Sequence, residues 1–362
     1  MMVQDLTAHL DAIRARYTRS NEMLDRALRH IPIGSQTFSK SHVQYPRGAA
    51  PMFLDRGKGS HVWDVDGHEY VDFVNGLLPV ILGYCDPDVD AAIRTQMEKG
   101  VSFTLPTALE TELAKLLAEL IPCAEMSRFF KNGSDATSAA IRVARSVTGR
   151  NRVAVCGYHG WQDWYIGSTL RNKGVPEVTR NLTSTFVYND LYSLHALLND
   201  HPGEFAAVIM EPMNVAEPQD DFLAKCRDLA HQHGALFVFD EVISGFRFHI
   251  GGAQTMYGVT PDLAAFGKSM GNGYPISALV GKAEYMKEME EVFLSGTFGG
   301  EALSLTASIA TIRKMQREPV HETIAKTGEV VRQNADRLIE KHGLGHCLST
   351  SGHPTWTFLN FK

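Results

Sequence analysis

Short strands that are apolar throughout alternate with helices over most of the chain, and this pattern sharply limits the possible folds. Apolar, β-rich runs of three to five residues recur at 128–130, 152–156, 184–188, 206–210, 236–239, 263–266 and 276–280. Strands without a polar face are typical of a parallel sheet that is covered by helices on both sides. We therefore predict an α/β fold with a mainly parallel sheet.

The remaining segments predict the elements around this sheet. Apolar residues at helical spacing predict helices at 8–28, 108–121, 135–147, 222–233, 303–315 and 320–342. We expect irregular chain at 34–50, a small antiparallel unit at 52–73 and a final strand at 355–361. The domains that we expect are an N-terminal segment (1–71), a large sheet-bearing domain (72–311) and a C-terminal small domain (312–362).

Composition excludes several classes of protein. The 362 residues include 35 Lys and Arg against 41 Asp and Glu, and no basic stripe suggests a nucleic-acid partner. The five cysteines are scattered without a C-x-x-C pair, which is typical of reduced thiols in a cytoplasmic protein. The N-terminus lacks the apolar core of a signal peptide, and no apolar stretch reaches the ~20 residues of a membrane span. We expect no membrane and no metal site.

Ligands of parallel sheets bind beyond the carboxyl ends of the strands, so the polar residues that follow each strand are candidate site residues. Gly133 and Ser134 follow the run 128–130 and open a helix, where backbone N–H groups can hold an anion. An ordinary helix cap explains these two residues equally well. Tyr158 and His159 follow the run 152–156 between glycines. Tyr158 could stack on a flat ligand or pack in the core, and His159 could be a base or simply hydrogen-bonded.

Two charged residues stand out after later strands. Asp240 directly follows the run 236–239, and an unpaired buried carboxylate is costly. A helix cap or an ion pair is the alternative explanation. Lys268 stands between the run 263–266 and a glycine-rich loop, where a desolvated amine can act as a Schiff-base nucleophile. A lysine that reaches solvent is equally compatible with the sequence.

These four sites together fit one cofactor. Pyridoxal 5′-phosphate (PLP) needs a lysine for its aldehyde, a carboxylate for its pyridine nitrogen, an aromatic ring to stack on and an anion site for its phosphate. The chain supplies all four, in the order anion site, aromatic ring, carboxylate and lysine. The sequence therefore predicts a PLP enzyme.

The sequence resembles the class III, fold-type-I PLP-dependent aminotransferases, and within them the glutamate-1-semialdehyde aminomutase-like branch. The matching stretches are 132–136, 157–160, 210–212, 239–242 with 245–247, 251–254, 257–262, 267–268 and 296–298. The resemblance runs from about Ile31 to the end of the chain. It implies a large domain with a mainly parallel seven-stranded sheet between helices, and a small α+β domain built from both chain ends.

The resemblance also implies a role for each matching residue. Lys268 would form the Schiff base and then move the proton between substrate and cofactor, and Asp240 would pair with the pyridinium nitrogen. Glu211 and Glu241 would support this network from nearby. Tyr158 and Val242 would cover the two faces of the ring, and Gly133 and Ser134 would hold the phosphate. Thr297 would reach the phosphate in the neighbouring subunit, which implies a homodimer.

The implied reaction is transamination: the cofactor takes an amino group from an amino-acid donor, becomes pyridoxamine phosphate, and passes the group to an aldehyde or keto acceptor. Intramolecular amine migration or racemisation is the first alternative. Residues 34–40, 161, 271–273 and 299–302 differ from the aminomutase pattern, so we expect another substrate. The family's small domain normally continues beyond the position of Lys362, so 312–362 is expected to be incomplete. A PLP-binding but catalytically idle protein is the second alternative.

Overall fold

The computed structural model describes residues 15–362, which group into two compact units. The first unit holds the described residues up to Leu77 together with Leu82–Asp86. The second holds Leu78–Ile81 and Pro87–Lys362. The three domains that we expect from the sequence, 1–71, 72–311 and 312–362, stay a prediction.

The first unit contains the small antiparallel sheet that residues 52–73 predict. Its order is β1-β2-β3, and the turn between β2 and β3 is built on Asp64, whose carboxylate accepts hydrogen bonds from the backbone of Asp66 and His68. The helix predicted at 8–28 is confirmed where the chain is described, and its first residues, 8–14, lie outside the described residues. The elements are α2 (Thr18–Ala27), η1 (Pro32–Gly34), η2 (Phe38–Lys40), β1 (Leu54–Lys58), β2 (His61–Asp64) and β3 (Glu69–Val71).

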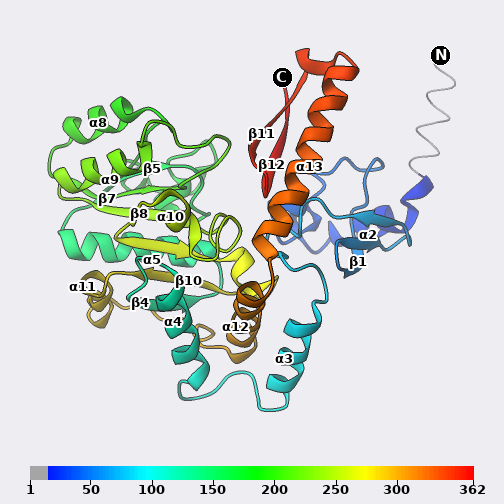
Figure 1. Cartoon of the computed structure of the whole chain (residues 1–362), viewed down its shortest axis with the longest axis horizontal. Helices are drawn as coiled ribbons and strands as arrows, with labels where there is room; N and C mark the ends of the chain where they lie inside the picture. The colour runs from blue at the N-terminus through cyan, green and yellow to red at the C-terminus, as the bar shows by residue number, and fades with distance from the viewer. Residues whose placement is uncertain (1–14) are drawn as a thin grey trace. The chain divides into compact units, whose positions relative to one another are not determined.

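The second unit is built on a seven-stranded sheet of order β4-β10-β9-β8-β7-β5-β6 (Figure 1). Strand β10 runs antiparallel to β4 and β9, and the other neighbouring strands pair in parallel, so the predicted mainly parallel sheet is confirmed. The strands are β4 (Met126–Phe130), β5 (Arg152–Cys156), β6 (Thr183–Thr185), β7 (Phe205–Met210), β8 (Leu236–Glu241), β9 (Leu263–Phe266) and β10 (Ser277–Gly281).

Helices cover both faces of the sheet, which explains why its central strands have no polar face. Every residue of β7, β8, β9 and β10 is buried. Side chains such as Val155, Ile209 and Val238 form one core with helix α5. Residues at alternating positions, such as Phe237 and Phe239, point to the other face and are fully buried too. Each such side chain contributes about 1.5–3 kcal/mol to folding.

The helices of the second unit agree with most of the sequence-based assignments. They are α3 (Pro87–Met97), α4 (Ala108–Leu120), α5 (Gly133–Thr148), α6 (Asp163–Ile166), α7 (Glu177–Arg180), α8 (Leu191–Asp200), α9 (Phe222–Gln232), α10 (Gly252–Tyr257), α11 (Ala283–Met286), α12 (Ala302–Arg317) and α13 (Val320–Lys341). Helix α13 packs on the hairpin of β11 (Leu348–His353) and β12 (Trp356–Phe361) (Figure 1). Within residues 15–362, no helix has both the length and the apolar character needed to span a bilayer.

The four neighbouring parallel strands β5, β7, β8 and β9 end at the same edge of the sheet. Cys156 pairs with Met210, Met210 with Phe239, and Glu241 with Phe266, so the strand ends are in register. The residues that follow these ends are therefore neighbours in space.

Candidate active site

The N-terminus of helix α5 forms one side of the site. The backbone N–H of Asn132 donates to the Asp135 carboxylate over 2.8 Å, which caps the helix. Ser134 is buried in the first turn. Thr137, one turn along, donates its hydroxyl to the carbonyl oxygen of His159 at 2.8 Å, which ties the helix to the loop after β5. Because the first N–H groups of a helix have no partner inside it, this end can hold an anion.

Two glycines allow three backbone segments to meet at this helix end. A Cβ atom on Gly133 would lie 2.6 Å from Cγ1 of Val242, which follows β8. Gly160 has a φ of +106°, and a Cβ atom there would lie 2.5 Å from Cβ of Ser134. Both distances are shorter than van der Waals contact allows. The phosphate site expected from the sequence therefore has Val242 and the loop after β5 packed directly against it.

We predict that Gly133→Ala lowers the affinity for PLP about tenfold, because the added methyl group must push Val242 away from the helix end at a cost of about 1–3 kcal/mol. Titration of the apoprotein with PLP measures this change. Gly345→Ala, in the C-terminal segment before β11, is the control, since a Cβ atom there meets nothing within 4 Å and its φ is not in the left-handed region. Unchanged PLP affinity in Gly133→Ala would contradict the placement of the cofactor at this helix end.

Asp240, at the end of β8, is buried and fixed by two hydrogen bonds. Its Oδ2 atom lies 2.8 Å from Nδ1 of His159, and the N–H of Val242 donates to Oδ1 at 3.1 Å. The His159 ring lies parallel to Trp164 at an interplanar angle of 12°, with the edge of Tyr165 against it. Nε2 of His159 is buried without a partner, so a proton on Nδ1, donated to Asp240, leaves no buried N–H unpaired.

The structure therefore distinguishes between the two explanations that the sequence left open for His159. The imidazole is a hydrogen-bonded side chain that holds Asp240, and its Nε2 atom is buried away from solvent. The sequence pattern could not identify this contact, because His159 and Asp240 are 81 residues apart in the chain.

Glu211, directly after β7, supports the loop that carries Tyr158. It accepts a hydrogen bond from the Tyr158 backbone N–H at 3.0 Å and another from the Asn214 side chain. Burial, together with the negative charge of Asp240, raises the pKa of Glu211 to about 7. Glu211 thus holds the backbone at Tyr158 and at the same time lies within electrostatic range of Asp240.

Glu241 does not join Asp240, which corrects the expectation that it supports the same network. Successive residues of a strand point to opposite faces, so Glu241 points away from Asp240. It is fully buried and accepts hydrogen bonds from Ser244, from the backbone of Ala253 and Gln254, and from the Gln254 side chain. Burial raises the pKa of Glu241, and the residue fixes the start of α10.

Tyr158, which lies just after β5, is 59% exposed, so it is accessible to a flat ligand. Its edge-to-face neighbour is Tyr165, whose hydroxyl donates to the carbonyl oxygen of Gly157 at 2.8 Å. Tyr165 therefore holds both the Tyr158 ring and the backbone of the turn that carries it.

Lys268 starts a short 3-10 turn, η3 (Lys268–Gly271), directly after β9. Its φ of +40° is unusual for a residue with a side chain. Burial lowers the pKa of Lys268, and the positive charge of Arg247 acts in the same direction, whereas Asp240 and Glu211 oppose the shift. The amine therefore lies within electrostatic range of both carboxylates and is easier to deprotonate than a surface lysine.

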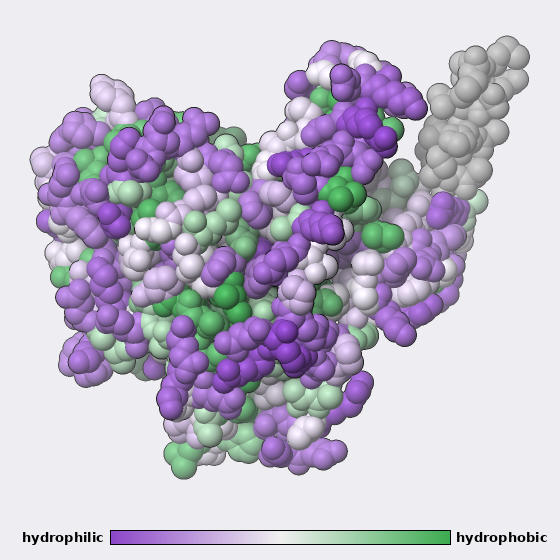
Figure 2. All heavy atoms as spheres, in the orientation of Figure 1, coloured by the Kyte–Doolittle hydropathy of each residue, from purple (hydrophilic) through white to green (hydrophobic). Residues whose placement is uncertain are grey.

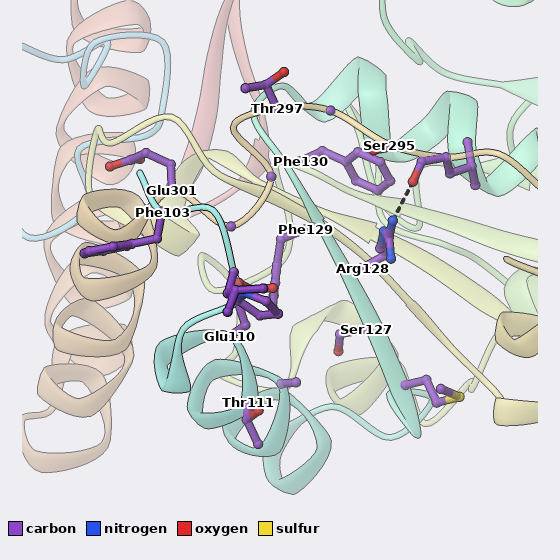
Figure 3. Close-up of a pocket in the computed structure, with 18 of the residues that line it drawn as sticks. Phe103, Glu110, Thr111, Ser127, Arg128, Phe129, Phe130, Ser295, Thr297 and Glu301 are labelled. Carbon is purple, nitrogen blue, oxygen red and sulfur yellow. Dashed lines mark hydrogen bonds between the residues drawn. The ribbon is translucent and has the colours of Figure 1, made fainter. Parts of the chain in front are cut away.

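Thr297 lies apart from these residues, at a pocket of about 730 Å³ beside the edge strand β4. Figure 3 shows Thr297 on the loop above Phe130, with Phe103 and Glu110 on the opposite wall. Arg128 fixes this loop, since its guanidinium donates to the carbonyl oxygen of Leu294 at 2.7 Å (Figure 3). No contact joins Thr297 to Lys268 or Asp240 in the described chain.

Comparison with known proteins identifies the family of this fold and site. Residues 44–348 match the family described as Aminotransferase class-III. The chain is 40% identical to the 3-aminobutyryl-CoA aminotransferase of Cloacimonas acidaminovorans over 359 residues, which cover 97% of this chain and 85% of the relative. The chain therefore belongs to the class III aminotransferases, and it is a PLP-dependent transaminase.

Two solved structures share the fold and the class. The FumI protein of Sphingopyxis sp. MTA144, in its PLP internal aldimine form, has a TM-score of 0.90 at 32% identity, over 95% of this chain and 84% of that one. The β-phenylalanine aminotransferase of Variovorax paradoxus has a TM-score of 0.87 at 28% identity, over 99% of this chain and 83% of that one. Together with the family match, they confirm the predicted fold class, reaction class and cofactor.

Proposed function

We propose that this aminotransferase takes its amino group from carbon 3 of a β-amino acyl compound, as a coenzyme A thioester, and delivers it to a keto acceptor. The relative at 40% identity is named for 3-aminobutyryl-CoA. The name of the Variovorax enzyme also specifies a β-amino compound. Both named substrates carry the amine on the carbon that is β to the acyl carbon, which supports this substrate class.

The residues at the strand ends fit PLP. Bound PLP supplies an aldehyde and an electron-withdrawing ring. We infer that the Lys268 amine holds the aldehyde, and that Nζ moves the proton to and from the carbon that bears the amine. Asp240, fixed by His159, would keep the pyridine nitrogen protonated. The observation that carries this proposal is the position of the Lys268 amine within electrostatic range of buried Asp240.

The remaining site residues would bind and orient the cofactor. Gly133 and Ser134 would hold the phosphate at the start of α5, and the exposed ring of Tyr158 would stack on one face of the pyridine. Val242, packed against Gly133, would cover the other face. Glu211 would act through the backbone of Tyr158 rather than by touching the ring.

A donor comparison tests the proposed substrate. Holoenzyme is mixed with 3-aminobutyryl-CoA, free 3-aminobutyrate, β-phenylalanine or L-alanine, and loss of the ~420 nm band of the bound cofactor is followed. We expect the thioester to react at least about tenfold faster than the other donors. Faster reaction with L-alanine would contradict the substrate class. An isomerised amine without a released carbonyl product would indicate an aminomutase, and no response to any donor would indicate an idle protein.

We also propose that the protein is a homodimer that joins through the face around Thr297. Loop 98–107 exposes Val101, Phe103 and Leu105, and Figure 2 shows hydrophobic side chains at the lower end of the molecule, where this loop joins α3 to α4. Phe293 and Phe298, beside Thr297, are 83% and 57% exposed. Contiguous exposed apolar side chains are typical of a protein interface.

The mass in solution tests the dimer. We expect light scattering to give twice the chain mass, and Phe298→Asp to shift the protein towards the monomer because a charge would be buried in the interface. Tyr192→Asp, at a residue that is 78% exposed on α8, is the matched control. A monomeric wild-type protein would contradict the proposal.

We further propose a cytoplasmic location. The five cysteines are all free, and Cys123, Cys156 and Cys226 are buried thiols. Reduced cysteines of this kind are typical of a reducing compartment.

A further inference from the structure

Arg247 is a buried arginine whose guanidinium donates hydrogen bonds to backbone carbonyls. The side chain follows β8 and is 3% exposed. Its Nη2 atom donates to the carbonyl oxygen of Leu78 at 2.6 Å, and Nη1 donates to that of Thr355 at 3.1 Å. Within residues 15–362 no carboxylate forms an ion pair with it, and its Nε atom has no hydrogen-bond partner. The guanidinium is therefore committed to holding two distant chain segments.

Burying a guanidinium without a carboxylate partner costs free energy of folding. Burial lowers the pKa of Arg247 to about 10, so the group keeps its charge at neutral pH. Apolar residues of similar volume often replace buried charges without loss of stability. No apolar residue, however, can provide the rigid, planar set of N–H donors of a guanidinium. The donor geometry and the charge of Arg247 therefore point to a role beyond filling space.

The Leu78 carbonyl links Arg247 to the lysine turn. It also accepts a hydrogen bond from the hydroxyl of Ser269, at 3.2 Å, and Ser269 directly follows Lys268. Leu78 has a φ of +76°, a conformation that is costly for a residue with a branched side chain. Such a conformation persists where its surroundings hold it, and here two donors hold the carbonyl.

The Thr355 carbonyl links Arg247 to the C-terminal hairpin. Thr355 lies in the turn between β11 and β12. Beside it, the His353 ring lies 4.4 Å from the ring of Phe248, and Trp356 packs against the cluster of Met213, Phe248 and Ala253. The hairpin turn is thus fastened to the segment that follows β8, and Arg247 is the hydrogen-bonded part of that attachment.

We propose that Arg247 is a positioning residue for Lys268, because it fastens the Leu78 carbonyl and the hairpin turn to the turn that begins at Lys268. The proposal rests on the proposed role of Lys268 as the residue that holds PLP. Arg247 acts through Leu78 and Ser269, and it touches neither cofactor nor substrate. A second effect follows from its charge, which favours the neutral amine of Lys268 and opposes the effect of Asp240 and Glu211, the other two charged groups that act on this lysine.

The association of PLP with the apoprotein tests this role without any amino donor. The rate constant is measured from the growth of the ~420 nm band between pH 6 and 10, where it should rise as Lys268 loses its proton. In Arg247→Met we expect the rate constant at neutral pH to fall about tenfold and the midpoint to move up by about one pH unit, since a nearby positive charge is lost. In Ser269→Ala, which removes no charge, we expect a smaller fall and an unchanged midpoint.

Arg332→Met is the matched control. Arg332 lies on α13 and also donates to a carbonyl of the hairpin, that of Gly352 at 3.1 Å, but it is paired with Glu329 and has no contact with Leu78. We expect its PLP association to equal that of the wild type. The double variant Arg247→Met, Ser269→Ala should bind PLP more slowly than Arg247→Met, but by less than the product of the two single effects, because both side chains act on one carbonyl.

Several results would overturn the proposal. One is a wild-type rate and midpoint in folded Arg247→Met, and another is an equal change in Arg332→Met, which would indicate general loosening of the hairpin. If Arg247→Met does not fold, a wild-type association rate in Ser269→Ala would overturn it instead. Failure of the donor comparison would leave these results unaffected, so the two proposals fail separately.

Discussion

Lys268→Ala should lower turnover by about five orders of magnitude while the protein stays folded and still binds PLP. The loss is large because one side chain has two roles, holding the cofactor aldehyde and moving the proton, and residues that act as a unit are lost together. The helix end at Gly133 and Ser134 and the ring of Tyr158 remain in place, so PLP should bind more weakly and without the ~420 nm band. Steady-state rates and absorbance spectra measure both effects.

Lys225→Ala is the control for this variant, because Lys225 is an exposed lysine on α9 whose amine bonds a backbone carbonyl. It should keep wild-type activity. Methylamine added to Lys268→Ala should restore part of the rate, since a small amine can carry the proton in place of Nζ. Near-normal turnover in Lys268→Ala would show that another residue holds the cofactor.

Asp240→Asn should retain PLP but lose activity by about a hundredfold to a thousandfold. A neutral amide cannot stabilise the protonated pyridine nitrogen, and removal of one electrostatic partner of a developing charge typically has an effect of this size. The amide keeps the shape of the carboxylate and can still accept the hydrogen bond from His159. The loss should therefore appear in kcat, with little change in circular dichroism or in PLP affinity.

A companion variant separates charge from positioning at Asp240. His159→Asn retains a donor near the place of Nδ1, whereas His159→Phe fills the space beside Trp164 without a donor. We expect His159→Phe to be the less active of the two, because Asp240 then loses the 2.8 Å hydrogen bond to its Oδ2 atom. Full activity in Asp240→Asn would contradict the role proposed for the carboxylate.

Local patterns in the sequence were sufficient to predict the sheet. The apolar composition of segments such as 206–210 and 236–239 predicts buried strands. When such strands are parallel, the polar residues that follow them must lie at the same edge of the sheet. Asp240 and Lys268 could therefore be assigned to one site before the structure was known. The hairpin partner β11 could not, because its sequence, Leu-Ser-Thr-Ser-Gly-His, has neither the apolar run nor the alternation of a buried strand.

Contacts between residues far apart in the chain account for what the sequence missed. His159 bonds Asp240 across 81 residues, and Arg247 bonds Thr355 across 108 and Leu78 across 169. No periodicity encodes such pairs. Glu241 differs for another reason: the family resemblance implies that it supports the network of Asp240, whereas the alternation of side chains along a strand turns the two carboxylates apart.

A single-turnover reaction tests the central claim, transfer of an amino group at the Lys268 site, most directly. Holoenzyme is mixed with excess 3-aminobutyryl-CoA, and both the ~420 nm band and the carbonyl product are measured. We predict that the band disappears with one equivalent of carbonyl product per subunit, and that added keto acid restores it. Loss of the band without carbonyl product, or no change with any amino donor, would contradict the account.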